Sequence, residues 1–71
     1  MTILIDTFSA EKHGNHFRAD LIQGDAGNVY VDIFVNADFR DRFYVSEENQ
    51  DDEGFIDAVV KSYFSKWMSH K

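Results

Sequence analysis

The last third of the chain has the apolar spacing of a helix. Between residues 54 and 70, large apolar side chains occur in adjacent pairs that repeat every four residues, and strands do not produce this spacing. The pairs form two rows, Phe55, Val59, Tyr63 and Trp67 in one and Ile56, Val60, Phe64 and Met68 in the other. The pattern predicts an amphipathic helix over residues 54–70.

Before residue 46, apolar residues alternate with polar ones, which is typical of strands. The alternation is most regular over residues 28–35, and it also predicts strands over residues 2–8, 17–23 and 39–45. The side expected to face the core carries Phe17, Ala19, Leu21, Val29, Val31, Ile33, Val35, Phe39, Asp41, Phe43 and Val45. We expect the helix to cover this side of the sheet.

Short polar segments separate the predicted strands. Residues 24–27 contain two glycines and an aspartate, which favour a hairpin turn. Residues 36–38 predict another turn, and residues 9–15 a polar connection. The chain, residues 1–71, is therefore predicted to be one small α+β domain, with an antiparallel sheet of three to four strands (a β-hairpin or meander) packed on one C-terminal helix.

Composition restricts the class of protein further. The 71 residues include no cysteine and 44% of them are hydrophobic, which predicts a folded domain without disulfide bonds. The formal net charge of −6 disfavours nucleic acid and anionic membranes as partners. It favours a basic protein partner, or serves solubility alone. The apolar run of residues 3–5 is neither a signal peptide nor a membrane span, so we expect a cytoplasmic protein, in the host cell cytoplasm if it is phage-encoded.

A run of acidic residues precedes the predicted helix. Asp51, Asp52 and Glu53 lie at its N-terminus, where the helix dipole favours carboxylates. Glu47 and Glu48 lie too far ahead of the helix to cap it, so they belong either to a solvated loop or to a contact surface. Together the five carboxylates are the candidate site for a basic partner.

The predicted helix carries more apolar surface than one sheet needs. Its two rows cover an arc of roughly 200°, whereas a stripe of roughly 100° is enough to cover one core. We therefore expect Tyr63, Phe64, Trp67 and Met68 to form an oligomer face, which predicts a homodimer. In the alternative, a curved sheet and the N-terminal strand bury both rows within one chain.

The opposite side of the predicted sheet combines aromatic and basic residues. They are Tyr30, Phe34, Tyr44, Arg18, Arg40 and Arg42. Rings that stack on bases, beside guanidinium groups that hold phosphate, are typical of single-stranded nucleic-acid binders. Asp20 and Asp32 are expected on the same side, and they favour the alternatives of cross-strand pairing or a protein contact.

Residues 27–34, Gly-Asn-Val-Tyr-Val-Asp-Ile-Phe, followed by a further strand and a C-terminal helix, resemble the PC4 transcriptional coactivator family. The resemblance implies a dimeric single-stranded DNA binder built of four strands and a helix. Asn28 and Phe34 stand where that family has basic residues, and the predicted helix is longer here.

No group of residues indicates catalysis, a metal or a cofactor. His13 and His16 have the spacing of two metal ligands, but transition-metal sites usually need three or four. The acidic run does not fit a calcium loop, because Asp52 and Ala58 stand where that loop needs Gly and Glu. We expect a protein that is not an enzyme.

These patterns predict a small acidic binding protein, of the inhibitor or accessory-factor type found in phages and mobile elements. We expect it to occupy a basic surface of a larger protein, with the acidic run giving charge complementarity and exposed aromatic residues anchoring the contact. The alternative is a homodimeric single-stranded nucleic-acid-binding protein that uses the aromatic and arginine face. A structural subunit of a larger assembly is a third hypothesis.

Overall fold

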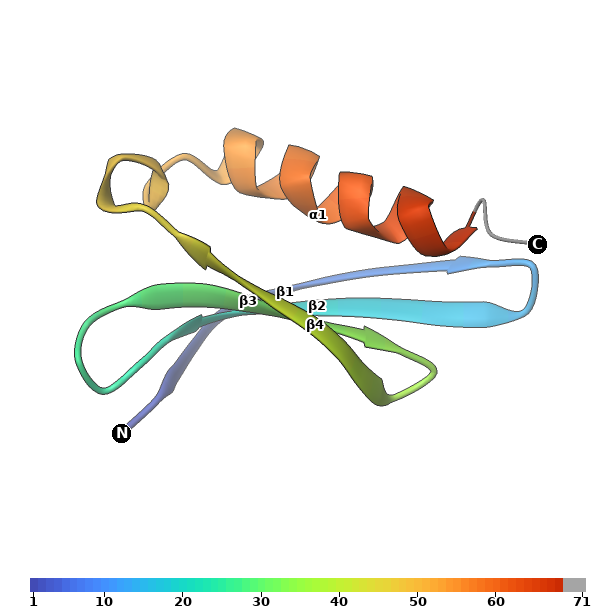
Figure 1. Ribbon diagram of the computed structural model, residues 1–71, viewed down its shortest axis with the longest axis horizontal. Helices are drawn as coiled ribbons and strands as arrows, with labels where there is room; N and C mark the ends of the chain where they lie inside the picture. The colour runs from blue at the N-terminus through green and yellow to red at the C-terminus, as the bar shows by residue number, and fades with distance from the viewer. Residues whose placement is uncertain (69–71) are drawn as a thin grey trace.

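Four strands form one antiparallel sheet, and one helix lies over one of its faces (Figure 1). The computed structural model describes the backbone of residues 1–68 and the side chains of residues 1–66. The elements are β1 (Ile3–Lys12), β2 (Asn15–Gln23), β3 (Val29–Val35), β4 (Asp38–Val45), a short 3-10 helix η1 (Glu47–Asn49) and α1 (Glu53–Met68). The strands lie in the order β1-β2-β3-β4, so each pairs with its neighbour in the sequence. The predicted α+β meander with a C-terminal helix is confirmed.

The connection between β1 and β2 is a tight turn. The prediction of a polar connection over residues 9–15 is wrong, because β1 continues to Lys12, which pairs with Asn15. Only His13 and Gly14 form the turn, with φ of 54° and 80°. Two consecutive positive φ values are typical of a type I′ turn, whose twist matches that of paired strands.

The turn between β3 and β4 has the same signs of φ but no glycine. Asn36 and Ala37 have φ of 53° and 72°, and they connect Val35 to its partner Asp38. Asn36 also fastens the turn to β2, because its Oδ1 accepts the His16 N–H at 2.9 Å and its own N–H donates to the His16 carbonyl at 2.8 Å. Asparagine tolerates the left-handed region, whereas alanine enters it at a cost in free energy.

A bulge in β4 changes the side of the sheet on which Phe39 lies. Ile33 pairs with Asp41, but the following residue, Phe34, pairs with Phe39, so Arg40 is an extra residue in β4. The prediction that Phe39 faces the core is therefore wrong. Its ring meets that of Phe34 on the open face, with centroids 5.8 Å apart, and its side chain is 54% exposed.

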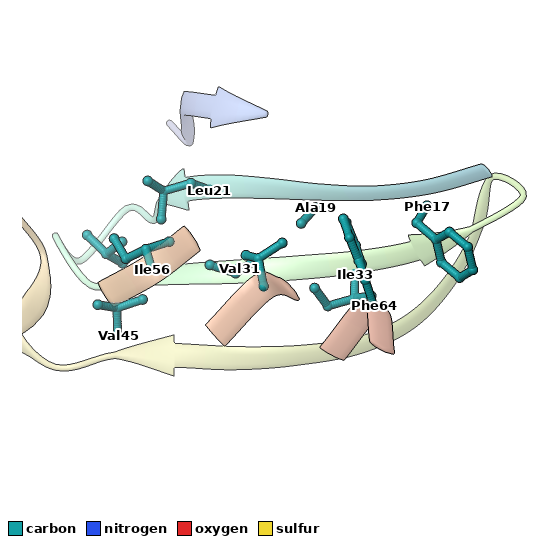
Figure 2. Close-up of a cluster of buried hydrophobic side chains, with 10 residues drawn as sticks. Phe17, Ala19, Leu21, Val31, Ile33, Val45, Ile56 and Phe64 are labelled. Carbon is teal, nitrogen blue, oxygen red and sulfur yellow. The ribbon is translucent and has the colours of Figure 1, made fainter. Parts of the chain in front are cut away.

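The core lies between α1 and strands β2, β3 and β4 (Figure 2). The sheet contributes seven buried apolar residues: Phe17, Ala19, Leu21, Val29, Val31, Ile33 and Val45. The helix contributes Ile56, Val60 and Phe64, whose spacing of four residues places them along one side of α1. Phe64 packs against Phe17, with ring centroids 5.6 Å apart.

Asp52 caps the N-terminus of α1. Its Oδ1 accepts the N–H of Phe55 at 3.0 Å, and its carbonyl accepts the N–H of Ile56 at 3.1 Å. Its own N–H donates to the Asn49 carbonyl at 3.1 Å, which joins the cap to η1. Side-chain capping bonds therefore account for one of the five acidic residues of the run.

In the part of the chain that the structure describes, no helix is both long and apolar enough to cross a membrane.

Candidate functional site

The acidic run lies at one end of the molecule. Together with the β2–β3 loop it forms the left end in Figure 1, whereas the β1–β2 and β3–β4 turns form the right end. Glu47, Glu48, Asp51, Asp52 and Glu53 are all exposed. None of the ion pairs in the described part of the chain involves them. Their charge is therefore presented to solvent, and we call this part of the molecule the acidic end.

A hollow of about 520 Å³ opens at the acidic end, between the β2–β3 loop and the segment that leads from β4 to η1. Its walls are residues 26–29 and 44–47, with Gln50. Tyr44 belongs to the predicted aromatic set and Glu47 to the predicted acidic set. The structure therefore joins the two predicted sets at one place.

A second hollow, of about 320 Å³, lies beside the first. Ile5, Leu21 and Val29 give it an apolar floor, and Asp51 and Glu53 give it two carboxylates. Gln50 and Val29 line both hollows. The acidic end thus combines exposed carboxylates with apolar surface, which is the combination that a lysine or arginine side chain needs for its charged head and its aliphatic stem.

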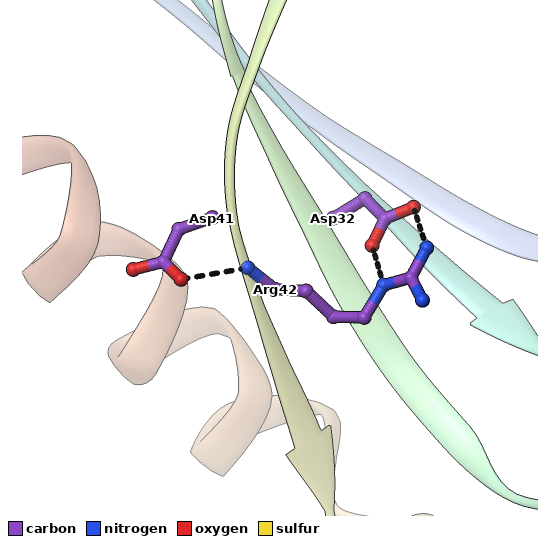
Figure 3. Close-up of polar contacts among 3 residues, drawn as sticks. All are labelled: Asp32, Asp41 and Arg42. Atoms are coloured by element: carbon purple, nitrogen blue, oxygen red, sulfur yellow. Dashed lines mark hydrogen bonds and ion pairs between the residues drawn. The ribbon is translucent and has the colours of Figure 1, made fainter.

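On the open face of the sheet, Asp32 and Arg42 form a pair across β3 and β4 (Figure 3). Arg42 Nε donates to Asp32 Oδ1 at 2.6 Å, and its Nη2 donates to Oδ2 at 3.2 Å. The guanidinium carbon of Arg42 also lies 4.3 Å from the centroid of the Tyr30 ring. The Asp32 carboxylate, followed by Tyr44, raises the pKa of the Arg42 guanidinium above its usual value. The positive charge of Arg42 is therefore balanced by Asp32 of the same chain.

Arg18 has a similar arrangement on β2. Its guanidinium carbon lies 4.3 Å from the centroid of the Phe34 ring, and its Nε lies 3.4 Å from Asp20 Oδ1. The Thr7 hydroxyl donates to the same carboxylate oxygen at 3.3 Å. Arg18 and Arg42 therefore both cover aromatic rings and face carboxylates of their own chain.

The predicted aromatic and arginine set is partly brought together. Tyr30, Phe34, Arg18 and Arg42 lie on the open face in direct contact, and the Tyr30 and Tyr44 ring centroids are 5.6 Å apart. Arg40 is exposed and is the extra residue of the β4 bulge. Tyr44 is 63% exposed, whereas Tyr30 and Phe34 are half-buried under the guanidinium groups.

The pairing of the strands adds two residues that the sequence did not single out. Leu4 pairs with Ile22, Ile22 with Tyr30, and Tyr30 with Tyr44. These four large side chains form one row across all four strands, which we call the apolar band. The alternation along each strand indicates which side a residue faces, but the register between strands decides which residues meet.

The helix does not leave a whole apolar row uncovered. Phe64 is buried in the core of a single chain, so its assignment to an oligomer face is wrong. Tyr63 is half-buried and stacks on Phe43, with centroids 4.9 Å apart. Phe55 is 42% exposed. The side chains of Trp67 and Met68, the other two residues of the predicted oligomer face, lie outside the described residues, and the homodimer stays a prediction.

His13, in the β1–β2 turn, and His16, on β2, do not form a metal site with other described residues. Among the described residues there is no group of three or more histidine or carboxylate side chains placed to hold a metal ion. His16 Nδ1 lies 3.7 Å from Glu11 Oε2, opposite it in the β1–β2 pair.

Comparisons of the chain with protein-family models, with curated proteins and with solved structures found no match.

Proposed function

We propose that this protein is a small acidic binding protein, without enzymatic activity, that occupies a basic surface of a larger protein. Its size and charge fit an inhibitor or accessory factor of phage or mobile-element type that acts in the cytoplasm. The observation that carries the proposal is the hollow lined by both Tyr44 and Glu47. A partner side chain that enters this hollow meets an aromatic anchor and a carboxylate together.

The acidic end supports the proposal in two ways. Its five carboxylates are exposed and make no ion pairs with described residues, so a basic surface meets them without first breaking internal ion pairs. The segment that carries them is held by the Asn49 and Asp52 hydrogen bonds, so less ordering is needed on binding. Such charges mainly raise the association rate and set the choice of partner.

The alternative, a single-stranded nucleic-acid binder, has less support. Stacking of bases needs free ring faces, and phosphate binding needs free guanidinium groups. Arg42 is bonded to Asp32 and lies over Tyr30, while Arg18 lies over Phe34. Binding of nucleic acid on this face therefore requires these contacts to be broken.

Capture from a cell lysate, repeated with each captured protein in purified form, tests the proposal. The test variant is Glu47→Lys with Glu48→Lys, which leaves the Asp52 cap in place. The control is Glu11→Lys with Asp38→Lys, which changes the net charge equally with two exposed acids away from the acidic end. We expect binding about tenfold weaker, or ~1.4 kcal/mol, in the test variant and a smaller change in the control.

Equal binding by the test variant and the unchanged protein would contradict the proposal. A labelled oligothymidine at low salt provides the comparison with the alternative function. Binding of that oligonucleotide, lost in Arg40→Ala with Tyr44→Ala, would favour the nucleic-acid function instead.

A further inference from the structure

The apolar band crosses the open face of the sheet from edge to edge. Leu4 and Tyr44, at its two ends, are 60% and 63% exposed. Ile22 and Tyr30, between them, are half-buried. With strands about 4.8 Å apart, the four residues span about 14 Å. No element within residues 1–68 covers this face, since α1 lies on the other one (Figure 1).

The band lies at the acidic end. Tyr44 is at once its last residue and a wall of the larger hollow, which Glu47 also lines. Beside the band, in the next row of the sheet, the Arg42 charge is balanced by Asp32. A ligand that crosses the band therefore reaches unbalanced negative charge at its Tyr44 end.

We propose that the band seats an amphipathic helix of the partner, with its apolar side chains on the band and a lysine or arginine in the hollow beside Glu47. This inference rests on the proposed function, and it adds the form of the partner. At a rise of 1.5 Å per residue, about 14 Å is the length of nine to ten helical residues. Residues i, i+3 or i+4, and i+7 of such a helix lie along one stripe, as in helix-in-groove recognition.

A second copy of this chain is the less suitable occupant. Its own helix has its buried row committed to its own sheet, through Ile56, Val60 and Phe64. Each copy carries a net charge of −6, so two acidic ends repel one another. A basic amphipathic helix satisfies both the band and the carboxylates.

Two labelled peptides of about 14 residues, long enough to form a helix on binding, test the inference. The first has leucines at i, i+3, i+4 and i+7 and lysines elsewhere. The second has the same composition in an order without an apolar stripe. Fluorescence polarisation compares their binding to the unchanged protein and to Leu4→Ser, Tyr44→Ser and Phe39→Ser.

Phe39→Ser is the matched control. Phe39 lies on the same open face and is 54% exposed, but it pairs with Phe34 at the other end of the sheet, outside the band. We expect the striped peptide to bind at least about tenfold more tightly than its isomer, and Leu4→Ser and Tyr44→Ser to remove most of that difference. Phe39→Ser should leave it unchanged. Circular dichroism of each variant shows that the fold is retained.

Other outcomes overturn the inference in distinguishable ways. Equal, salt-sensitive binding of both peptides, lost in the Glu47→Lys with Glu48→Lys variant, would refute the helix but keep the proposed function. No binding of either peptide, with a captured basic protein still bound, would do the same. A dimer seen by light scattering and lost in Tyr44→Ser would assign the band to a second copy. Direct binding of labelled oligothymidine, lost in Tyr44→Ser, would assign it to nucleic acid.

Discussion

Arg42 on β4 holds Asp32 on β3 through two hydrogen bonds on the open face of the sheet. Asp32 is only 7% exposed although none of the described helices or strands covers that face. It is shielded by neighbouring side chains, among them the Arg42 guanidinium that also lies over Tyr30. The pair therefore offsets the free-energy cost of a nearly buried carboxylate at the centre of the open face.

Replacing Arg42 should lower the free energy of unfolding more than replacing Asp32. Arg42→Met leaves the Asp32 carboxylate shielded from water and without its donor, and an unsatisfied buried group costs about 1–3 kcal/mol. Asp32→Asn removes the charge that needs a donor, so it should lower the free energy of unfolding by less. The double variant should recover part of the loss. Urea unfolding of the four proteins checks the order, and equal losses in the two single variants would contradict it.

Replacement of Arg42 by lysine should create a dependence of stability on alkaline pH. The Asp32 carboxylate raises the pKa of the Arg42 guanidinium. The stabilisation is therefore fully present below the unfolded pKa and is lost only as pH rises through the still higher folded value, well above pH 11. Lysine titrates near a pKa of about 10.4, so in Arg42→Lys the contribution should fall as pH rises past that value. The difference in unfolding free energy between the two proteins, measured from about pH 8 to about pH 11, should widen with pH. A constant difference would contradict the argument.

The regular parts of the fold could be predicted because their residues repeat with a clear period. Val29, Val31 and Ile33 alternate as a strand requires, and Ile56, Val60 and Phe64 recur as one side of a helix requires. The length of β1 could not be predicted, because an edge strand needs few apolar residues. The position of Phe39 was predicted wrongly, because a one-residue bulge moves a side chain to the other face and leaves no mark on the apolar pattern.

The candidate site, too, could be predicted from the sequence only in part. The exposed acidic run could be recognised from the sequence, but the capping role of Asp52 alone among its members depends on backbone geometry. The meeting of Tyr44 with Glu47 depends on where β4 ends. The band depends on the register that places Leu4 beside Ile22, which alternation along one strand does not determine.

The two apolar rows of α1 should differ sharply in their contribution to stability. Ile56 is fully buried against the sheet, whereas its neighbour Phe55 is 42% exposed. Ile56→Ala should lower the free energy of unfolding by about 2–5 kcal/mol. Phe55→Ala, although it removes a larger side chain, should change it by less than about 1 kcal/mol. Thermal unfolding of both variants checks this, and a loss at Phe55 equal to that at Ile56 would show that the helix is rotated about its axis.

Mutations of Asp52 and of its neighbour Asp51 should have different effects on stability, because only Asp52 caps the helix. Asp52→Ala removes the acceptor of the Phe55 N–H and should cost about 0.5–2 kcal/mol. Asp52→Asn keeps a side-chain oxygen and should cost less. Asp51→Ala, next to it, makes no hydrogen bond to the helix N-terminus and should change stability by less than about 0.5 kcal/mol. If Asp51→Ala cost as much as Asp52→Ala, general charge at the helix N-terminus would explain the effect better than a specific cap.

Ala37 should be a site at which glycine stabilises the protein. Its φ of 72° lies in the left-handed region, which costs an L-residue with a Cβ roughly 1–2 kcal/mol and costs glycine almost nothing. Part of that gain is offset, because glycine also makes the unfolded chain more flexible. Ala37→Gly should therefore raise the free energy of unfolding by about 0.5–1 kcal/mol. Ala26→Gly is the control: Ala26 is also exposed in a loop, but it is not among the residues with positive φ, so there only the effect on the unfolded chain remains and stability should fall. Chemical unfolding of the two variants beside the unchanged protein decides the matter, since changes of the same sign in both would show that Ala37 is not strained.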